Sequence, residues 1–130
     1  MIRKILATAA GLVVAFAVVM LGELIAHRLF PIEMPTSMND AALAAAMAAA
    51  PLGAKLSLAV IYFLAPLAGT FTALAVARRQ AVWPAYVVTG LFLLAAAANF
   101  FMLPHPLWLV VACVAAILVG GWLGIRLARR

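Results

Sequence analysis

Apolar residues fill the chain in four long stretches, and polar residues are largely confined to the gaps between them. The stretches cover about residues 5–30, 52–77, 83–103 and 107–127. Each is long enough to cross a bilayer, because a membrane-spanning helix needs about 20 mostly apolar residues. The pattern predicts an all-α integral membrane protein in which residues 1–130 form a single transmembrane domain.

Prolines mark where the spans end and restart. Pro31 ends the first span because proline cannot continue the backbone hydrogen bonding of a helix. The turn Pro104-His105-Pro106 separates the third span from the fourth. Since short connections favour antiparallel neighbours, we expect an up-down four-helix bundle. Pro66 predicts a kink in the second span, acting as a hinge or as a simple bend.

A short alanine-rich segment, residues 41–50, lies between the first and second spans. It is too short to span a membrane, so we expect an interfacial helix. A loop from Pro31 to Asp40 leads into it, and three polar residues are candidate helix caps: Ser37, Asn39 and Asp40. Its role is either a plain connector or a lid over an outward-facing cavity.

The composition supports a membrane location. Hydrophobic residues make up 70% of the chain and charged residues 9%, too few to give a 13.7 kDa domain a polar surface in water. The net charge of +6 comes from small basic clusters at the span ends, which argues against a nucleic-acid partner. The single cysteine, Cys113, excludes an internal disulfide and is expected to pack inside the fourth span.

The first span also has features of a secretory signal. Arg3 and Lys4 precede an apolar run that contains Ala15-Phe16-Ala17, a small-x-small pattern like a cleavage site. The run continues to Phe30, however, which is longer than the apolar core of a signal peptide. We therefore expect an uncleaved span that keeps Met1.

The basic residues predict the orientation. One group shares one side of the membrane: Arg3, Lys4, Arg78, Arg79, Arg126, Arg129 and Arg130. Only Arg28 and Lys55 fall on the other side. Because lysine and arginine are retained on the cytoplasmic side, both termini are expected in the cytoplasm. Tryptophans then occupy both interfaces, Trp83 and Trp122 inside and Trp108 outside.

Polar side chains within or beside the spans lie at one depth, near the outer surface. They are Glu23, His27, Lys55, Asn99 and His105. Such residues are costly in a bilayer and mark functional sites, so these five are the candidate ligand-binding residues. Asn99 also has a structural interpretation, a hydrogen bond across the bundle.

Glu23 and His27 are four residues apart and therefore share a helix face. This spacing suits a metal pair, a proton relay or an ion pair. Further metal ligands would have to come from the same side: His105, Asp40 or Glu33. A buried carboxylate needs a partner in any case, so structural pairing is preferred and no metal is predicted. The candidate partners of Glu23 are Lys55, Arg28 and His27.

Gly120 and Gly124 form a small-xxx-small pair in the fourth span. Such pairs let helices approach closely. The sequence leaves open whether they pack within the bundle or between two protomers.

Three features together resemble a family of small uncharacterised bacterial inner-membrane proteins with four spans: Gly22-Glu23 through His27 to Pro31, the Pro104-His105-Pro106-x-Trp108 turn, and the four-span layout. The resemblance implies the fold and a bacterial inner (plasma) membrane, and brings no activity or cofactor. The chain is also similar to the small multidrug-resistance transporters, which have four spans and a proton-exchanging glutamate in the first. Glu23 would be that residue, although it lies nearer the outer end.

Two functions follow. The first is a non-enzymatic membrane protein that binds a lipid-like or quinone-like ligand, or a membrane partner, through the outer polar residues. The alternative is a homodimeric proton-coupled transporter of small molecules that uses Glu23. No nucleophile, base and oxyanion donors can be assembled from the sequence, so an enzyme is less expected than either function, although Glu23, His27 and His105 leave a metalloenzyme open. The sequence does not indicate whether the protein has a cofactor.

Overall fold

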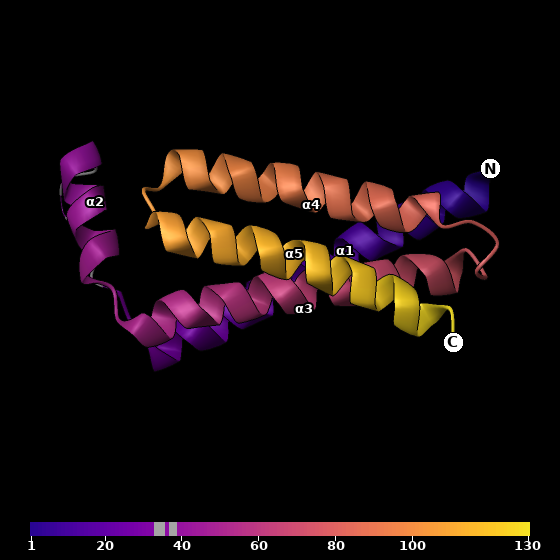
Figure 1. Ribbon diagram of the computed structural model, residues 1–130, viewed down its shortest axis with the longest axis horizontal. Coiled ribbons are helices and arrows are strands. Elements are labelled where there is room, and N and C mark those ends of the chain that lie inside the picture. Colours follow the sequence, from indigo (N-terminus) through magenta and orange to yellow (C-terminus); the bar gives the residue numbers. More distant parts are fainter. Residues whose placement is uncertain (33–35, 37–38) are drawn as a thin grey trace.

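The computed structural model describes residues 1–32, 36 and 39–130 and shows a helical bundle (Figure 1). The helices are α1 (Ile2–Leu29), α2 (Asp40–Ala49), α3 (Leu52–Val76), α4 (Trp83–Met102) and α5 (Leu107–Ala128). The described residues form no strand. The four long helices alternate in direction, so the all-α up-down bundle is confirmed.

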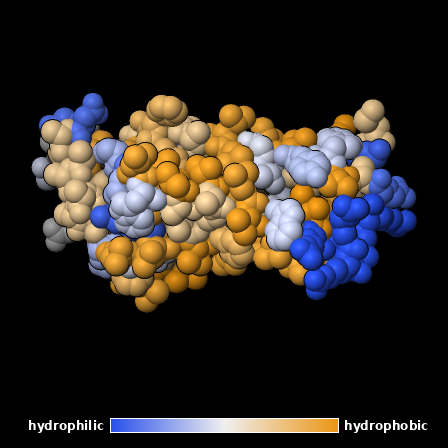
Figure 2. All heavy atoms as spheres, viewed as in Figure 1, coloured by the Kyte–Doolittle hydropathy of each residue, from blue (hydrophilic) through white to orange (hydrophobic). Residues whose placement is uncertain are grey.

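The four long helices are long and apolar enough to cross a membrane. Their bounds lie within three residues of the predicted spans. A 28-residue helix measures about 42 Å, so α1 exceeds a hydrocarbon core of about 30 Å and must tilt or protrude. Large apolar side chains cover the outside of the bundle; Phe101, for example, is 92% exposed. Figure 2 shows this apolar surface between two more polar ends.

Helix α3 lies between α1 and α5 and packs extensively against both. On the α1 side, Gly11 and Gly69 face each other. A Cβ atom on Gly11 would lie 2.6 Å from the carbonyl oxygen of Gly69, and one on Gly69 would lie 2.8 Å from the carbonyl oxygen of Gly11. This approach of two backbones therefore requires glycine on both helices.

The predicted glycine pair of α5 packs inside the bundle, against α3. A Cβ atom on Gly120 would collide with the carbonyl group of Phe63, and one on Gly124 with the carbonyl oxygen of Leu67. Both glycines are buried. The face suggested by sequence for contact with a second protomer is thus occupied by α3 of the same chain.

Helix α4 packs loosely against its neighbours, although the short turn that joins it to α5 predicts close packing of these two helices. It contacts α1, α3 and α5, but each contact is much less extensive than those of α3 with α1 and α5. The short turn between α4 and α5 therefore does not make them the best-packed pair. The reason is the placement of small residues: only Gly121 brings α5 close to α4, at Thr89, whereas Gly90 of α4 faces open space.

Helix α2 lies across the end of the bundle, apart from the long helices (Figure 1). Asn39 is its N-cap, and the Asn39 side chain accepts a hydrogen bond of 2.7 Å from the backbone N–H of Ala42. At the other end, Lys55 Nζ donates to the carbonyl oxygen of Ala48 at 3.4 Å, where a cation also favours the helix dipole. The predicted loop residues Glu33, Pro35 and Ser37 lie outside the described residues.

The basic residues gather at the opposite end, where both termini lie (Figures 1 and 2). The α3–α4 turn there ends α3 in a Schellman motif. The N–H of Arg79 donates to the carbonyl oxygen of Leu74, and the N–H of Arg78 donates to that of Ala75. The motif places Arg78 in the left-handed region, with φ of 53°, a position that usually holds glycine.

This turn yields a stability prediction. Replacing Arg78 by glycine should raise the free energy of unfolding by about 1 kcal/mol, because glycine adopts a positive φ without the steric cost of a Cβ atom. Unfolding in mixed micelles, followed by circular dichroism, measures the change. Arg78→Lys keeps the charge and the Cβ atom and should leave stability unchanged; equal stability of the two variants would contradict the strained turn.

Candidate ligand-binding site

The end of the bundle beside α2 contains a cavity of about 420 Å³. Four of the five predicted ligand-binding residues line it: Glu23 and His27 of α1, Asn99 of α4, and His105 of the α4–α5 turn. The rest of the lining is apolar: Ala26, Phe30, Ile32, Met47, Ala54, Leu58, Ile61 and Leu103. The cavity therefore has a polar side and an apolar side.

Three elements bring the polar side chains together. Glu23 and His27 are one turn apart on α1, and both side chains are exposed. Asn99 lies in the last turn of α4. The flanking prolines end α4 and start α5, which leaves His105 between them. Its Nδ1 lies 2.8 Å from the carbonyl oxygen of Leu103 and its ring is edge-on to Phe100. Since a carbonyl only accepts, Nδ1 carries the hydrogen and Nε2 is a free acceptor or, when protonated, a donor.

Asn99 joins the cavity to the bundle core. Its Nδ2 donates a hydrogen bond of 3.0 Å to the hydroxyl oxygen of Tyr62 on α3, which is the bond across the bundle expected from the sequence. Tyr62 is 5% exposed, and its ring stands edge-on to Phe92 with 5.6 Å between the ring centroids. This contact holds the Asn99 side chain at the cavity wall.

Tyr62 is not among the candidate residues predicted from the sequence. A signal was available, because a phenol in the middle of an apolar span must find a hydrogen-bond partner. Asn99 is the only amide at a matching depth in the predicted spans. The pair could have been proposed from these two observations.

Lys55 does not line this cavity. It borders a smaller hollow of about 50 Å³, shared with Met47 of α2 and with His105. Its ammonium group is turned to the C-terminal carbonyl of α2. The structure therefore gives Lys55 a role in anchoring α2, while His105 and Met47 border both spaces.

The predicted ion pairs of Glu23 do not form. Among the residues that the structure describes, Glu23 makes no hydrogen bond or ion pair with Lys55, Arg28 or His27. Lys55 is turned to α2, and Arg28, five residues along α1, projects about 140° away from Glu23 around the helix axis. The carboxylate is instead exposed at the cavity, where its charge can be solvated.

A metal site is not assembled by the described residues, in which no three histidine, cysteine or acidic side chains lie close enough to share an ion. Asp40 is an exposed residue at the start of α2. Glu33, the third suggested ligand, lies outside the described part of the chain.

A packed apolar core lies between the cavity and the basic end. It includes Phe92, Cys113 and Ile117. The threonines of this region donate to carbonyls of their own helices, Thr70 to Pro66 at 2.7 Å, for example. Thr72 and Thr89 do the same with Ala68 and Ala85. These hydroxyls are satisfied by backbone and do not line the cavity.

Comparisons with protein-family models, curated proteins and solved structures found no match to this chain. Functional inference therefore depends on the geometry of the molecule.

Proposed function

We propose that this protein binds a membrane-dissolved amphipathic molecule, lipid-like or quinone-like, without chemically changing it. The observation that supports the proposal is the two-sided cavity: Glu23, His27, Asn99 and His105 converge on a space whose remaining lining is apolar. Its volume of about 420 Å³ is within the range of roughly 300–1,000 Å³ typical of ligand pockets.

The side chains suggest what the head of the ligand presents. The second N–H of the Asn99 amide is a hydrogen-bond donor, the His27 imidazole can donate or accept, the free Nε2 of neutral His105 accepts, and the Glu23 carboxylate only accepts. A head with carbonyl or ester oxygens and a nearby hydroxyl would match them. The tail of the ligand would lie against Phe30, Leu58 and Ile61.

The proposed location is a bacterial inner membrane, with the basic end and both termini in the cytoplasm and the cavity at the outer surface. The distribution of charge supports this orientation, because all lysines and arginines except Arg28 and Lys55 belong to the basic end. Trp83 begins α4 at that end, and Trp108 lies in the first turn of α5 at the other.

The proposal is tested by titration of the purified protein in nanodiscs. A short-chain benzoquinone serves as the quinone-like probe and a lysophospholipid as the lipid-like probe. Replacing Trp83 and Trp122 by phenylalanine leaves Trp108, three residues after His105, as the reporter. We expect a saturable change in its fluorescence with one of the probes. Glu23→Gln should weaken binding about tenfold, because a hydrogen bond to a charged group is lost.

Arg28→Gln is the matched control for this titration. It removes a charge from the same helix, at a residue that does not line the cavity. Binding should be unchanged in this variant. A fluorescence change that never saturates with either probe, or an equal loss in both variants, would contradict binding in the cavity.

One observation favours the alternative of a homodimeric proton-coupled transporter. The Glu23 carboxylate is exposed and has no ion-pair partner among the described residues, as a titrating proton carrier requires. Uptake into proteoliposomes under a proton gradient distinguishes the two functions. Because the threonines below the cavity are bonded to backbone, we expect no proton-driven uptake. Uptake by the native protein that is lost in Glu23→Gln would establish the transporter.

A further inference from the structure

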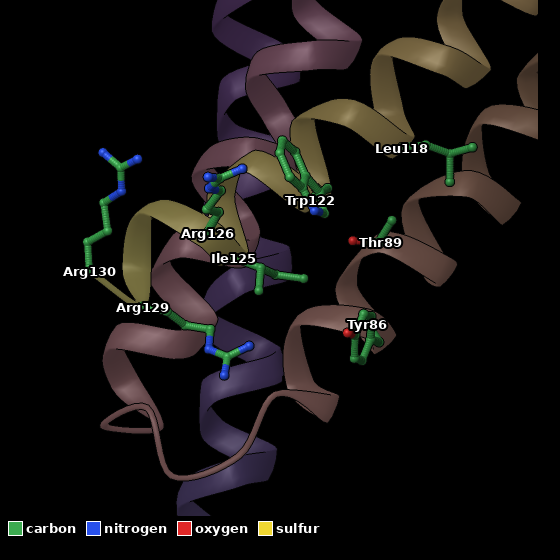
Figure 3. A pocket seen from close by; sticks show the side chains of 9 residues that line it. Tyr86, Thr89, Leu118, Trp122, Ile125, Arg126, Arg129 and Arg130 are labelled. Atoms are coloured by element: carbon green, nitrogen blue, oxygen red, sulfur yellow. The ribbon is translucent and has the colours of Figure 1, made fainter.

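We infer a second binding site, specific for an anionic phospholipid, in the groove between α4 and α5 at the basic end of the bundle. The groove has a volume of about 510 Å³ (Figure 3). It lies between two helices that pack only loosely against each other, and Thr89 of α4 and Gly121 of α5 are among its lining residues. It lies at the opposite end from the proposed ligand cavity and shares no residue with it.

The polar lining of the groove fits a phosphate group. Arg126 lies in the last turn of α5, Arg129 is the C-cap of this helix three residues later, and both line the groove. Figure 3 shows Arg129 extending toward Tyr86 of α4, whereas Arg130 points away. A guanidinium group binds phosphate oxygens in pairs, and the Tyr86 hydroxyl can add a third donor.

The charge around the groove is unbalanced. Its lining contains arginines and no acidic residue. The acidic residues that the structure describes, Glu23 and Asp40, belong to the opposite end of the molecule. A bound anion would therefore neutralise positive charge that the described part of the protein leaves uncompensated.

The remaining lining indicates a lipid. Leu118 and Ile125 form an apolar wall of the groove. The Arg126 guanidinium group lies over the exposed Trp122 ring, 5.1 Å from the ring centroid. Tryptophan at this depth is typical of the bilayer interface. Further along the same two helices lies a second hollow of about 290 Å³, lined only by apolar residues such as Leu93 and Val114. An acyl chain attached to a phosphate at Arg126 would follow this seam, as lipids do in basic pockets between spans.

Native mass spectrometry with added lipid tests the site. The probes are dioleoyl phosphatidylglycerol and, as the neutral lipid, dioleoyl phosphatidylcholine, each added to the purified full-length protein in mild detergent. We expect phosphatidylglycerol to be retained preferentially. The double variant Arg126→Gln/Arg129→Gln should bind it at least about tenfold more weakly.

Two further variants separate the groove from the general charge of this end. Arg78→Gln/Arg79→Gln removes the same charge outside the groove and should retain the lipid. Leu118→Trp places a larger side chain at an exposed position of the apolar wall and so narrows the groove. It should weaken the retention of phosphatidylglycerol although the charge is unchanged. All variants should keep the circular-dichroism unfolding transition of the native protein, which shows that they are folded.

Three results would overturn the inference: equal loss of phosphatidylglycerol in the two double variants, equal retention of phosphatidylcholine by the native protein, or displacement of phosphatidylglycerol by inorganic phosphate at an equal concentration. The first would assign the effect to diffuse charge. The second would remove the selectivity for an anion. The third would make free phosphate the occupant.

Discussion

Replacing Gly124 by leucine should destabilise the bundle by at least about 3 kcal/mol and greatly reduce the yield of folded protein. Gly124 lies at a close approach of α5 to α3, and its missing side chain leaves room for the carbonyl oxygen of Leu67 and the hydroxyl of Thr70. Backbone cannot move aside as a flexible side chain can, so the two helices must separate. Unfolding in mixed micelles, followed by circular dichroism, measures the loss.

Gly90→Leu is the matched control for this prediction. Gly90 lies within α4, and a Cβ atom there would meet nothing within 4 Å. The same substitution should therefore change stability by no more than about 0.5 kcal/mol. Equal stability of the Gly124 and Gly90 variants would show that α3 and α5 do not pack as described.

The second large effect is expected at the ligand cavity. Replacing Ala26 by tryptophan should reduce probe binding beyond the measurable range, because the indole ring would occupy much of the space between α1, α3 and α4. Ala26 is only partly buried, and the open cavity beside it can accept the larger side chain without displacing the backbone. Titration with the cavity probes, read from ligand-induced shifts in thermal unfolding, measures the loss.

Ala17→Trp is the control, since Ala17 is an exposed residue of the same helix that does not line the cavity. It should bind the probe like the native protein. The unfolding transition of Ala26→Trp without probe confirms that this variant folds. Normal binding by a folded Ala26→Trp protein would place the ligand elsewhere.

The helices could be predicted from the sequence because their length and hydropathy are local properties. The partners of the helices could not. Gly120 and Gly124 predict a close approach, but the spacing is the same whether the neighbour is α3 or a second protomer. The loose packing of α4 was also not foreseen, since it depends on which small residues face one another after folding.

The candidate site was predicted to a similar extent. Counting residues from the span ends places Glu23, His27, Asn99 and His105 at one depth, and the structure brings these four around one cavity. Depth in the membrane does not specify which way a side chain points around the helix axis. The predicted set therefore also included Lys55, which is turned toward α2. The groove between α4 and α5 depends on helix packing and has no signal in the sequence beyond its arginines.

Native mass spectrometry of the protein extracted directly from its membrane tests the central claim most directly. We expect the native protein to carry a small molecule with the mass of a lipid-like or quinone-like compound that is missing from Ala26→Trp and kept by Ala17→Trp. A phospholipid held between α4 and α5 would remain in all three proteins and is thereby distinguished. A cavity that is empty in the native protein, or the same set of bound molecules in Ala26→Trp, would contradict the proposed function.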